Sequence, residues 1–164
     1  MILIGIGANL PTEAFGTPRR ACEAALRSLG SAEVRVIKRS RWYKSAPLPP
    51  SDQPWFVNGV ARVATALDPR DLLALLHRIE RGMGRERADV NAPRVIDLDL
   101  LAYDDVVSDA PGGPALPHPR LQERAFVLLP MAEIAPDWRH PATGRRVRDL
   151  IAALGAEQKV VALE

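Results

Sequence analysis

The pattern of hydrophobic and polar positions predicts alternating strands and helices along the chain. Short runs of Ile, Val and Leu indicate strands, and apolar residues three and four positions apart indicate amphipathic helices. Strands are expected at residues 1–7, 34–43, 55–66 and 93–103. Helices are expected at residues 18–30, 69–83, 122–134 and 147–154. The connections at 44–54, 84–93 and 104–117 are rich in Pro, Gly or charged residues and are expected to be irregular.

Local capping signals set the starts of the two long amphipathic helices. Thr17 stands directly before Pro18, and Asp68 stands directly before Pro69. Thr and Asp accept hydrogen bonds from the free amides of a first helical turn, and Pro fits the first helical position. Pro130 falls inside the third predicted helix, where its missing amide is expected to bend or break the helix.

The order of these elements predicts the fold class. Strand, helix, two strands, helix and strand is the order of an α+β, ferredoxin-like βαββαβ core, with both helices on one face of the sheet. The helices expected after residue 122 would cover part of the other face, which gives a three-layer α/β/α arrangement. The chain, residues 1–164, is therefore expected to form a single domain.

Composition narrows the classes of protein to which the chain can belong. The 164 residues are 47% hydrophobic and 26% charged, and the net charge of +2 gives no reason to expect a nucleic-acid partner. Cys22 is the one cysteine, so no internal disulfide can form, and its place in a helical pattern indicates core packing. No signal peptide and no apolar run of membrane-spanning length is found. We expect a cytoplasmic protein with no membrane partner.

Two carboxylates on a predicted buried strand are the first indication of a functional site. Asp97 and Asp99 are spaced i, i+2, so they share one face of the strand, while Ile96 and Leu98 alternate with them. Adjacent carboxylates repel each other and are costly to bury without a cation. Mg²⁺ ions carrying phosphates would meet this need. A salt bridge to Arg94 is the simpler alternative.

Six short motifs in order make the sequence similar to one family. It resembles the 6-hydroxymethyl-7,8-dihydropterin pyrophosphokinases of folate biosynthesis over nearly the whole chain. The motifs are Tyr43-Lys44-Ser45-Ala46-Pro47-Leu48, Asp52-Gln53-Pro54 with Asn58, Arg78-Ile79-Glu80, Pro93-Arg94 with Asp97-Leu98-Asp99, Pro117-His118-Pro119-Arg120, and Arg124-Ala125-Phe126-Val127-Leu128.

The resemblance implies transfer of the terminal diphosphate of ATP to the hydroxymethyl group of the pterin, with release of AMP. It assigns the pterin to Ser45, Ala46, Leu48, Phe56, Asn58 and Phe126. It assigns ATP to Glu80, Arg87, Arg94, Leu100, His118 and Arg124. Asp97 and Asp99 would hold two Mg²⁺ ions, and Arg85 and Arg94 would join them as catalytic residues. The small-molecule substrates imply no macromolecular partner, and we expect a monomer.

The family pattern also has departures here. Val90-Asn91-Ala92 stands where relatives commonly carry a Trp, and the surrounding loop is about one residue shorter. The irregular loops 44–54 and 84–93 are expected to act as lids that exclude water. Two other classes of function remain open: a metal-dependent phosphodiesterase or nuclease, and a ferredoxin-like RNA-binding module.

Overall fold

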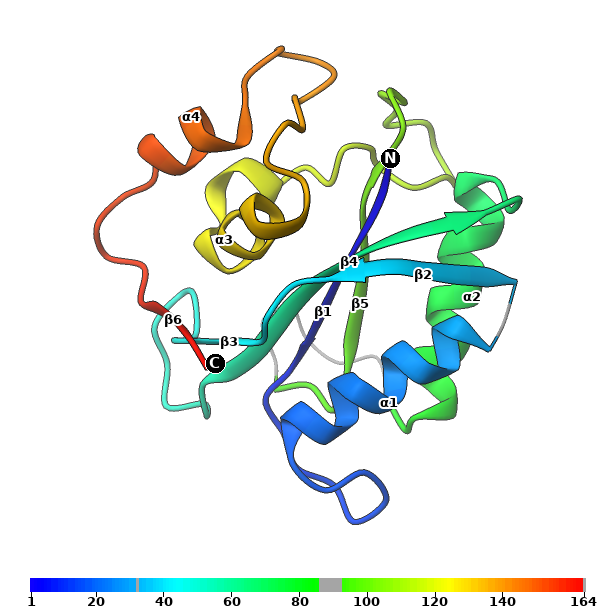
Figure 1. Ribbon diagram of the computed structural model, residues 1–164. Coiled ribbons are helices and arrows are strands. Elements are labelled where there is room, and N and C mark those ends of the chain that lie inside the picture. The colour runs from blue at the N-terminus through cyan, green and yellow to red at the C-terminus, as the bar shows by residue number, and fades with distance from the viewer. Residues whose placement is uncertain (32, 86–92, 164) are drawn as a thin grey trace.

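The computed structural model describes the chain except for residues 32, 86–92 and 164. In the described part, six strands form one sheet, and helices lie on both of its faces (Figure 1). The strands are β1 (Ile2–Ala8), β2 (Val34–Arg39), β3 (Tyr43–Ser45), β4 (Phe56–Thr65), β5 (Asp97–Tyr103) and β6 (Val160–Ala162). The helices are α1 (Pro18–Gly30), α2 (Pro69–Gly82), α3 (Ala125–Ile134) and α4 (Val147–Ala152), with a 3₁₀ turn at Leu121–Glu123.

The strand order confirms the ferredoxin-like core. Strand β1 lies between β5 and β4 and is antiparallel to both, and β2 and β3 pair with the outer side of β4. Helices α1 and α2 begin where the capping signals predict. The amide of Arg20 donates to Thr17 Oγ1 at 3.3 Å, and the amide of Asp71 donates to Asp68 Oδ1 at 2.8 Å.

The single strand predicted at residues 34–43 is wrong, because the chain breaks it into β2 and β3. Strand β2 pairs with the later half of β4, and β3 pairs with the earlier half. At the break, the amide of Ser40 donates to the carbonyl of Val60 at 2.9 Å, but the amide of Val60 donates to the Ser40 hydroxyl, at 3.0 Å. Trp42 is fully buried at the break and packs against Gly59, where a Cβ atom would lie 2.7 Å from its ring. The hydrophobic pattern of residues 34–43 did not indicate this interruption.

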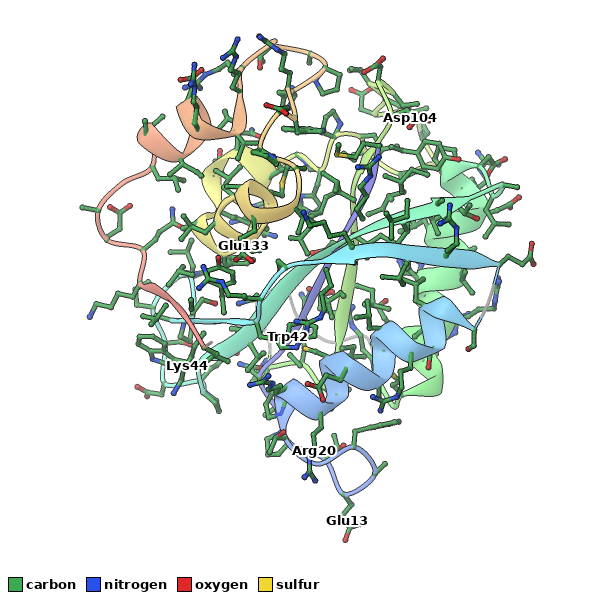
Figure 2. All side chains as sticks on the ribbon, viewed as in Figure 1. Glu13, Arg20, Trp42, Lys44, Asp104 and Glu133 are labelled. Atoms are coloured by element: carbon green, nitrogen blue, oxygen red, sulfur yellow. The ribbon has the colours of Figure 1, made fainter. Side chains whose placement is uncertain are left out.

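Each face of the sheet packs against its own hydrophobic core. Leu98 and Leu100 of β5 point with Ile4 of β1 toward α1 and α2. Leu3 and Leu101 point to the other face, toward α3 and α4. In Figure 2, Trp42 lies between the sheet and α1, whereas Glu133 lies at α3 on the opposite side. This is the three-layer arrangement predicted from the element order.

Helix α3 and strand β6 both differ from the prediction. The residues before 125 form the 3₁₀ turn, and α3 then continues through Pro130 without breaking. The loss of one amide is tolerated because Pro130 is buried in a helix whose remaining residues pack on β3, β4 and α4. Strand β6 was not predicted at all, because three residues have no periodicity and pair only with the equally short β3.

Candidate active site

A cavity of about 390 Å³ lies between the sheet and the N-terminal end of α3. Its walls come from β1, β4 and β5, from the turn that follows β3, and from the segment before α3. Eleven residues predicted from the family motifs line it: Ser45, Ala46, Leu48, Phe56, Asn58, Arg94, Asp97, Asp99, His118, Arg124 and Phe126. The structure thus brings most of the predicted residues to one place.

The floor of the cavity depends on a glycine in β1. A Cβ atom on Gly7 would lie 2.8 Å from Oδ1 of Asn58, which is closer than real Cβ atoms approach a neighbour. A Cβ atom on Gly5 would meet only side-chain atoms of Leu101, at 3.4 Å. Close packing against the strand therefore requires a glycine at position 7 more strictly than at position 5.

Replacing Gly7 by Ala is expected to disturb the site more than replacing Gly5 by Ala. The new methyl group must displace the buried Asn58 amide, so we expect affinity for a ligand bound by that amide to fall by about tenfold, the equivalent of one hydrogen bond. Gly5→Ala is the matched control on the same strand and face. Equal ligand dissociation constants for the two variants, measured by calorimetry, would contradict this account.

Asn58 is positioned to read the edge of a planar ligand. Its side chain is buried, and its Nδ2 donates to Ser45 Oγ at 2.5 Å across the β3–β4 pair. One N–H of the amide and the carbonyl oxygen remain for a ligand, which together offer a donor and an acceptor in one plane. Phe56 and Phe126 are half-buried walls of the same cavity, as predicted.

Asp97 is held by two arginines from outside its strand. Arg85 Nη1 donates to Oδ1 of Asp97 at 2.7 Å, and Arg94 Nη1 donates to Oδ2 at 2.8 Å. The simpler alternative from the sequence, a salt bridge between Arg94 and the carboxylate pair, is therefore present for Asp97. Both carboxylate oxygens are neutralised, so Asp97 is stable in this site without a metal ion.

Asp99 has a different environment from Asp97. Its side chain makes no hydrogen bond or ion pair with any residue that the structure describes. Burial, reinforced by the negative charge of Asp97, raises the pKa of Asp99 to about 7. The positive charges of Arg124 and Arg94 oppose that rise. A half-buried carboxylate with a raised pKa favours a nearby cation.

Glu80 and Arg85 lie behind the carboxylates and do not line the cavity. Glu80 is 5% exposed, and its Oε2 accepts from the amide of Leu98 at 2.9 Å and from Arg85. Burial raises the pKa of Glu80, and the bonds from Leu98 and Arg85 oppose that rise. The chain Glu80–Arg85–Asp97 therefore fixes the start of β5, a role that the sequence did not reveal for Glu80.

The remaining residues predicted to bind ATP have three different locations. Arg124 lines the cavity with its Cζ atom 5.4 Å from the centre of the Phe126 ring. Leu100 does not reach the cavity, because strand alternation directs its side chain into the core beneath α1 and α2. Arg87 lies outside the described residues.

His118 enters the cavity from the segment that carries the Pro117-His118-Pro119-Arg120 motif. Its backbone amide donates to the carbonyl of Leu101 at 2.8 Å, and its Nδ1 accepts from the amide of Arg120 at 3.2 Å. Burial and the positive charge of Arg124 lower the pKa of His118 to about 4. The imidazole is thus neutral at pH 7, with Nε2–H as its free donor.

The imidazole of His118 is expected to stay neutral in the ligand-free protein throughout the physiological pH range. Because burial disfavours the imidazolium, an NMR titration of the His118 ring should give a midpoint near pH 4. Burial also lowers the pKa of His140, so its ring serves as an internal comparison. A midpoint for His118 at the ordinary value near 6.5 would contradict the described burial.

Asn9 is an important residue that the sequence reasoning missed. Its buried side chain donates to Oε1 of Gln53 and to the carbonyl of Pro54, both at 3.0 Å, and accepts from the amide of Arg94 at 2.8 Å. The carbonyl of Arg94 in turn accepts from the amides of Asn9 and Leu10. Asn9 therefore ties the loop beside the cavity to the segment that carries Arg94. The available signal in the sequence was a polar Asn just after a predicted buried strand.

The layers around the sheet weigh against an RNA-binding module. An RNA-binding module of this fold needs an open sheet face, but helices cover both faces here. No cluster of three or more His, Cys, Asp or Glu residues that could hold a metal occurs in the described part of the chain. None of the described helices has the length and apolar character needed to cross a membrane.

Comparison with known proteins gives a consistent result. Residues 3–136 match the family model described as 7,8-dihydro-6-hydroxymethylpterin-pyrophosphokinase. A 2-amino-4-hydroxy-6-hydroxymethyldihydropteridine pyrophosphokinase of Pseudomonas aeruginosa is 42% identical over 153 residues, which cover 93% of this chain and 90% of the relative. The enzyme of the same name from Methylorubrum extorquens is 39% identical over 92% of this chain and 91% of its own.

Solved structures agree on the fold. The structure described as Plasmodium falciparum HPPK-DHPS wild type with pteroate matches with a TM-score of 0.67 and 13% sequence identity. The match covers 92% of this chain but 41% of the Plasmodium chain, so this chain spans less than half of that longer protein.

Proposed function

Because the chain belongs to the 7,8-dihydro-6-hydroxymethylpterin-pyrophosphokinase family, we propose that it transfers the β,γ-diphosphate of ATP to the hydroxymethyl group of 6-hydroxymethyl-7,8-dihydropterin. The products are the pterin diphosphate, AMP and a proton. The observation that carries this proposal is that the Asn58 amide and the Asp97–Asp99 pair open into the same cavity. One end of the cavity suits a planar heterocycle, and the other suits a chain of phosphates.

The pterin is proposed to lie against β4 and the turn at residues 45–48. The free donor and acceptor of Asn58 match the amide-like edge of a pterin ring. Phe56 and Phe126 supply aromatic faces on which a flat ring stacks. The chain around Ala46 and Leu48 closes the remaining side of this part of the cavity.

The triphosphate is proposed to lie along Arg94, His118 and Arg124. The two guanidinium groups neutralise phosphate charge, and the neutral imidazole of His118 donates a hydrogen bond without adding charge. Arg85 acts from behind, by holding Asp97. Phosphoryl transfer depends mainly on alignment and neutralisation, which these groups supply.

The residues present fit a divalent cation. Asp99 is a half-buried carboxylate whose side chain accepts no hydrogen bond from the described residues, and Asp97 shares its strand face. We propose that Asp97 and Asp99 hold two Mg²⁺ ions when ATP binds. Bound Mg²⁺ would neutralise the charge that develops on the phosphate oxygens. Arg85 and Arg94 balance the charge of Asp97 in the ligand-free site.

In the proposed reaction, the pterin hydroxyl oxygen forms a bond to the β-phosphorus of ATP. The bond from that phosphorus to the oxygen bridging the α- and β-phosphates breaks, and AMP leaves with both electrons of the broken bond. The residues of the cavity align the two substrates and exclude water, so ATP is not lost to hydrolysis. We further propose a monomer that acts on small-molecule substrates in the cytoplasm, where Cys22 stays a buried free thiol.

Product analysis tests this function. The protein is incubated with ATP and the reduced pterin, with Mg²⁺ or with EDTA, and nucleotides are resolved by chromatography. We expect AMP to form in step with consumed pterin, only when Mg²⁺ is present. ADP as the product, or AMP formed without the pterin, would contradict the proposed function.

A further inference from the structure

Gln158 lies beyond the family-matched residues 3–136, in the segment that leads into β6. Its side-chain amide makes two hydrogen bonds to the chain just before α3. Oε1 accepts from the amide of Ala125 at 2.8 Å, and Nε2 donates to the carbonyl of Glu123 at 2.8 Å. These two backbone groups flank Arg124, so one side chain holds the backbone of Arg124 from both sides.

Arg124 occupies a junction that needs such support. Its backbone is extended, with φ −116° and ψ 109°, between the 3₁₀ turn and the first residue of α3. The Arg124 side chain makes no capping bond to the helix. The first amides of a helix have no partner within the helix, and the Gln158 oxygen satisfies the first of them. The Arg124 guanidinium is thereby left free to line the cavity beside Phe126.

The segment that carries Gln158 is itself fixed to the pterin side of the site. The carbonyl of Lys159 accepts from the amide of Ala46 at 3.0 Å, and Ser45 is paired with Val160 in the β3–β6 register. The C-terminal segment therefore joins the turn after β3 to the start of α3. Both of these elements line the cavity.

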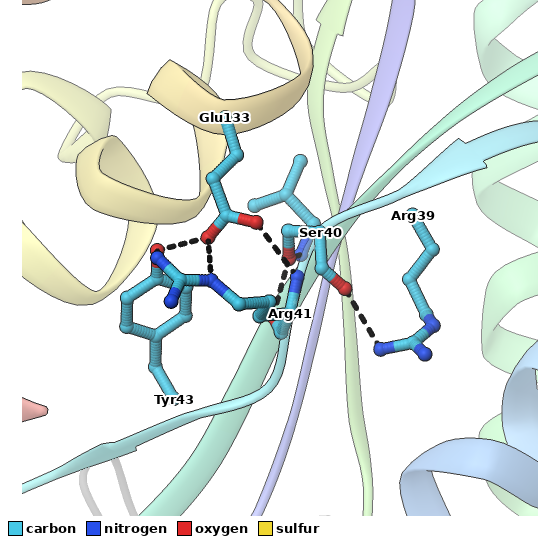
Figure 3. Close-up of polar contacts among 6 residues, drawn as sticks. Arg39, Ser40, Arg41, Tyr43 and Glu133 are labelled. Carbon is cyan, nitrogen blue, oxygen red and sulfur yellow. Dashed lines mark hydrogen bonds and ion pairs between the residues drawn. The ribbon is translucent and has the colours of Figure 1, made fainter. Parts of the chain in front are cut away.

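The other end of α3 is fixed independently. Oε1 of Glu133 accepts from the amide of Arg41 at 3.0 Å, and its Oε2 accepts from Arg41 Nε and from the Tyr43 hydroxyl (Figure 3). Loss of the Gln158 bonds would thus leave α3 attached to the sheet at its C-terminal end. The expected disturbance is local to Arg124 and Phe126.

We infer that Gln158 is a positioning residue that holds Arg124 in place for the triphosphate. This inference rests on the proposed function, because the role of Arg124 does. Gln158 lies outside the cavity lining and acts through the backbone that carries Arg124. A small misplacement of a charged group in such a site is enough to reduce the rate of transfer.

A double-mutant cycle tests the inference through activity. We compare Gln158→Ala, Arg124→Ala and the double variant, with Lys159→Ala as a control because that side chain is exposed. We expect Gln158→Ala to lower kcat about tenfold with little change in KM for the pterin, and to have almost no further effect when Arg124 is already Ala. The same loss in both backgrounds, or no loss, would overturn the inference.

A second measurement does not depend on activity and covers the case in which Gln158→Ala folds poorly. Gln158→Glu keeps the acceptor for the Ala125 amide but removes the donor to Glu123, so we expect normal folding with reduced kcat. Hydrogen exchange of the Ala125 amide should quicken about tenfold in Gln158→Ala and stay near wild type in Gln158→Glu. Unchanged exchange in Gln158→Ala would show that the hydrogen bond does not hold this junction, even if the wild-type protein forms no AMP.

Discussion

Replacing Asp99 by Asn is expected to abolish diphosphate transfer and, at the same time, to stabilise the ligand-free protein. The lost carboxylate would hold Mg²⁺, and removing such a group costs on the order of 4 kcal/mol of transition-state stabilisation, or about 10³-fold in rate. The ligand-free protein gains because it no longer holds a half-buried carboxylate whose side chain accepts no hydrogen bond from the described residues and whose pKa is raised by burial and by the charge of Asp97. We expect its free energy of unfolding at pH 8 to rise by about 1–3 kcal/mol.

The direction of the expected change in stability follows from the protonation of Asp99. Burial raises the pKa of Asp99 to about 7, well above its value in an unfolded chain. The folded state therefore binds more protons than the unfolded state between about pH 4 and pH 7. Over that range the wild-type protein loses stability as the pH rises, and Asp99→Asn lacks this loss. Denaturant unfolding in EDTA at pH 5 and pH 8 should show a variant advantage that is larger at pH 8.

Asp97→Asn is the matched comparison on the same strand face. Asp97 accepts from both Arg85 and Arg94, whereas Asn has one acceptor oxygen, so the replacement removes one of the two hydrogen bonds and the negative charge that both guanidinium groups face. We expect this variant to lose activity as well, but to be less stable than wild type by about 1–3 kcal/mol. Opposite stability changes at the two positions are the expected signature. A destabilised Asp99→Asn at pH 8 would contradict the unpaired state described for Asp99.

Replacing Asn58 by Leu is expected to remove pterin recognition and leave ATP binding intact. Leu has nearly the same shape but neither the donor nor the acceptor, so both partner atoms of the pterin edge would be buried unpaired. Loss of two such bonds predicts a fall in kcat/KM for the pterin of about 10²–10³-fold. Affinity for a non-hydrolysable ATP analogue, measured by calorimetry, should change less than twofold.

Replacing Ser45 by Ala tests how much the orientation of the Asn58 amide contributes to pterin recognition. The Ser45 hydroxyl accepts from Nδ2 of Asn58, so its loss frees the amide to rotate without removing it. We expect a smaller effect, about tenfold on kcat/KM for the pterin. A variant Asn58→Leu that turns over the pterin as well as wild type would remove the pterin from this part of the cavity.

Patterns local in sequence predicted the fold well. The caps at Thr17 and Asp68 and the alternation of Asp97 with Leu98 depend on neighbouring residues, and each of them is found in the structure. The break between β2 and β3 could not be predicted in this way. It depends on the packing of Trp42 against Gly59 of β4, and Gly59 lies 17 positions later in the sequence.

The sequence predicted which residues line the site more reliably than it predicted which residues hold them in place. Family motifs identified the residues that line the cavity, but not what holds them. The hydrogen bond from Asn9 to Gln53 joins residues 44 positions apart. The hydrogen bond from the Ala125 amide to Gln158 joins residues 33 positions apart. Glu80 and Leu100 illustrate the same limit, since each lies near the site in sequence while its side chain is directed elsewhere by the packing.

The most direct test of the account is the fate of the β-phosphorus of ATP. ATP labelled at that phosphorus is incubated with the protein, Mg²⁺ and the reduced hydroxymethyl pterin, and the labelled products are separated. Diphosphate transfer predicts that the label moves to the pterin and that the AMP formed carries none. Label retained in ADP, with an unlabelled pterin phosphate, would show simple γ-phosphate transfer and contradict the proposed reaction.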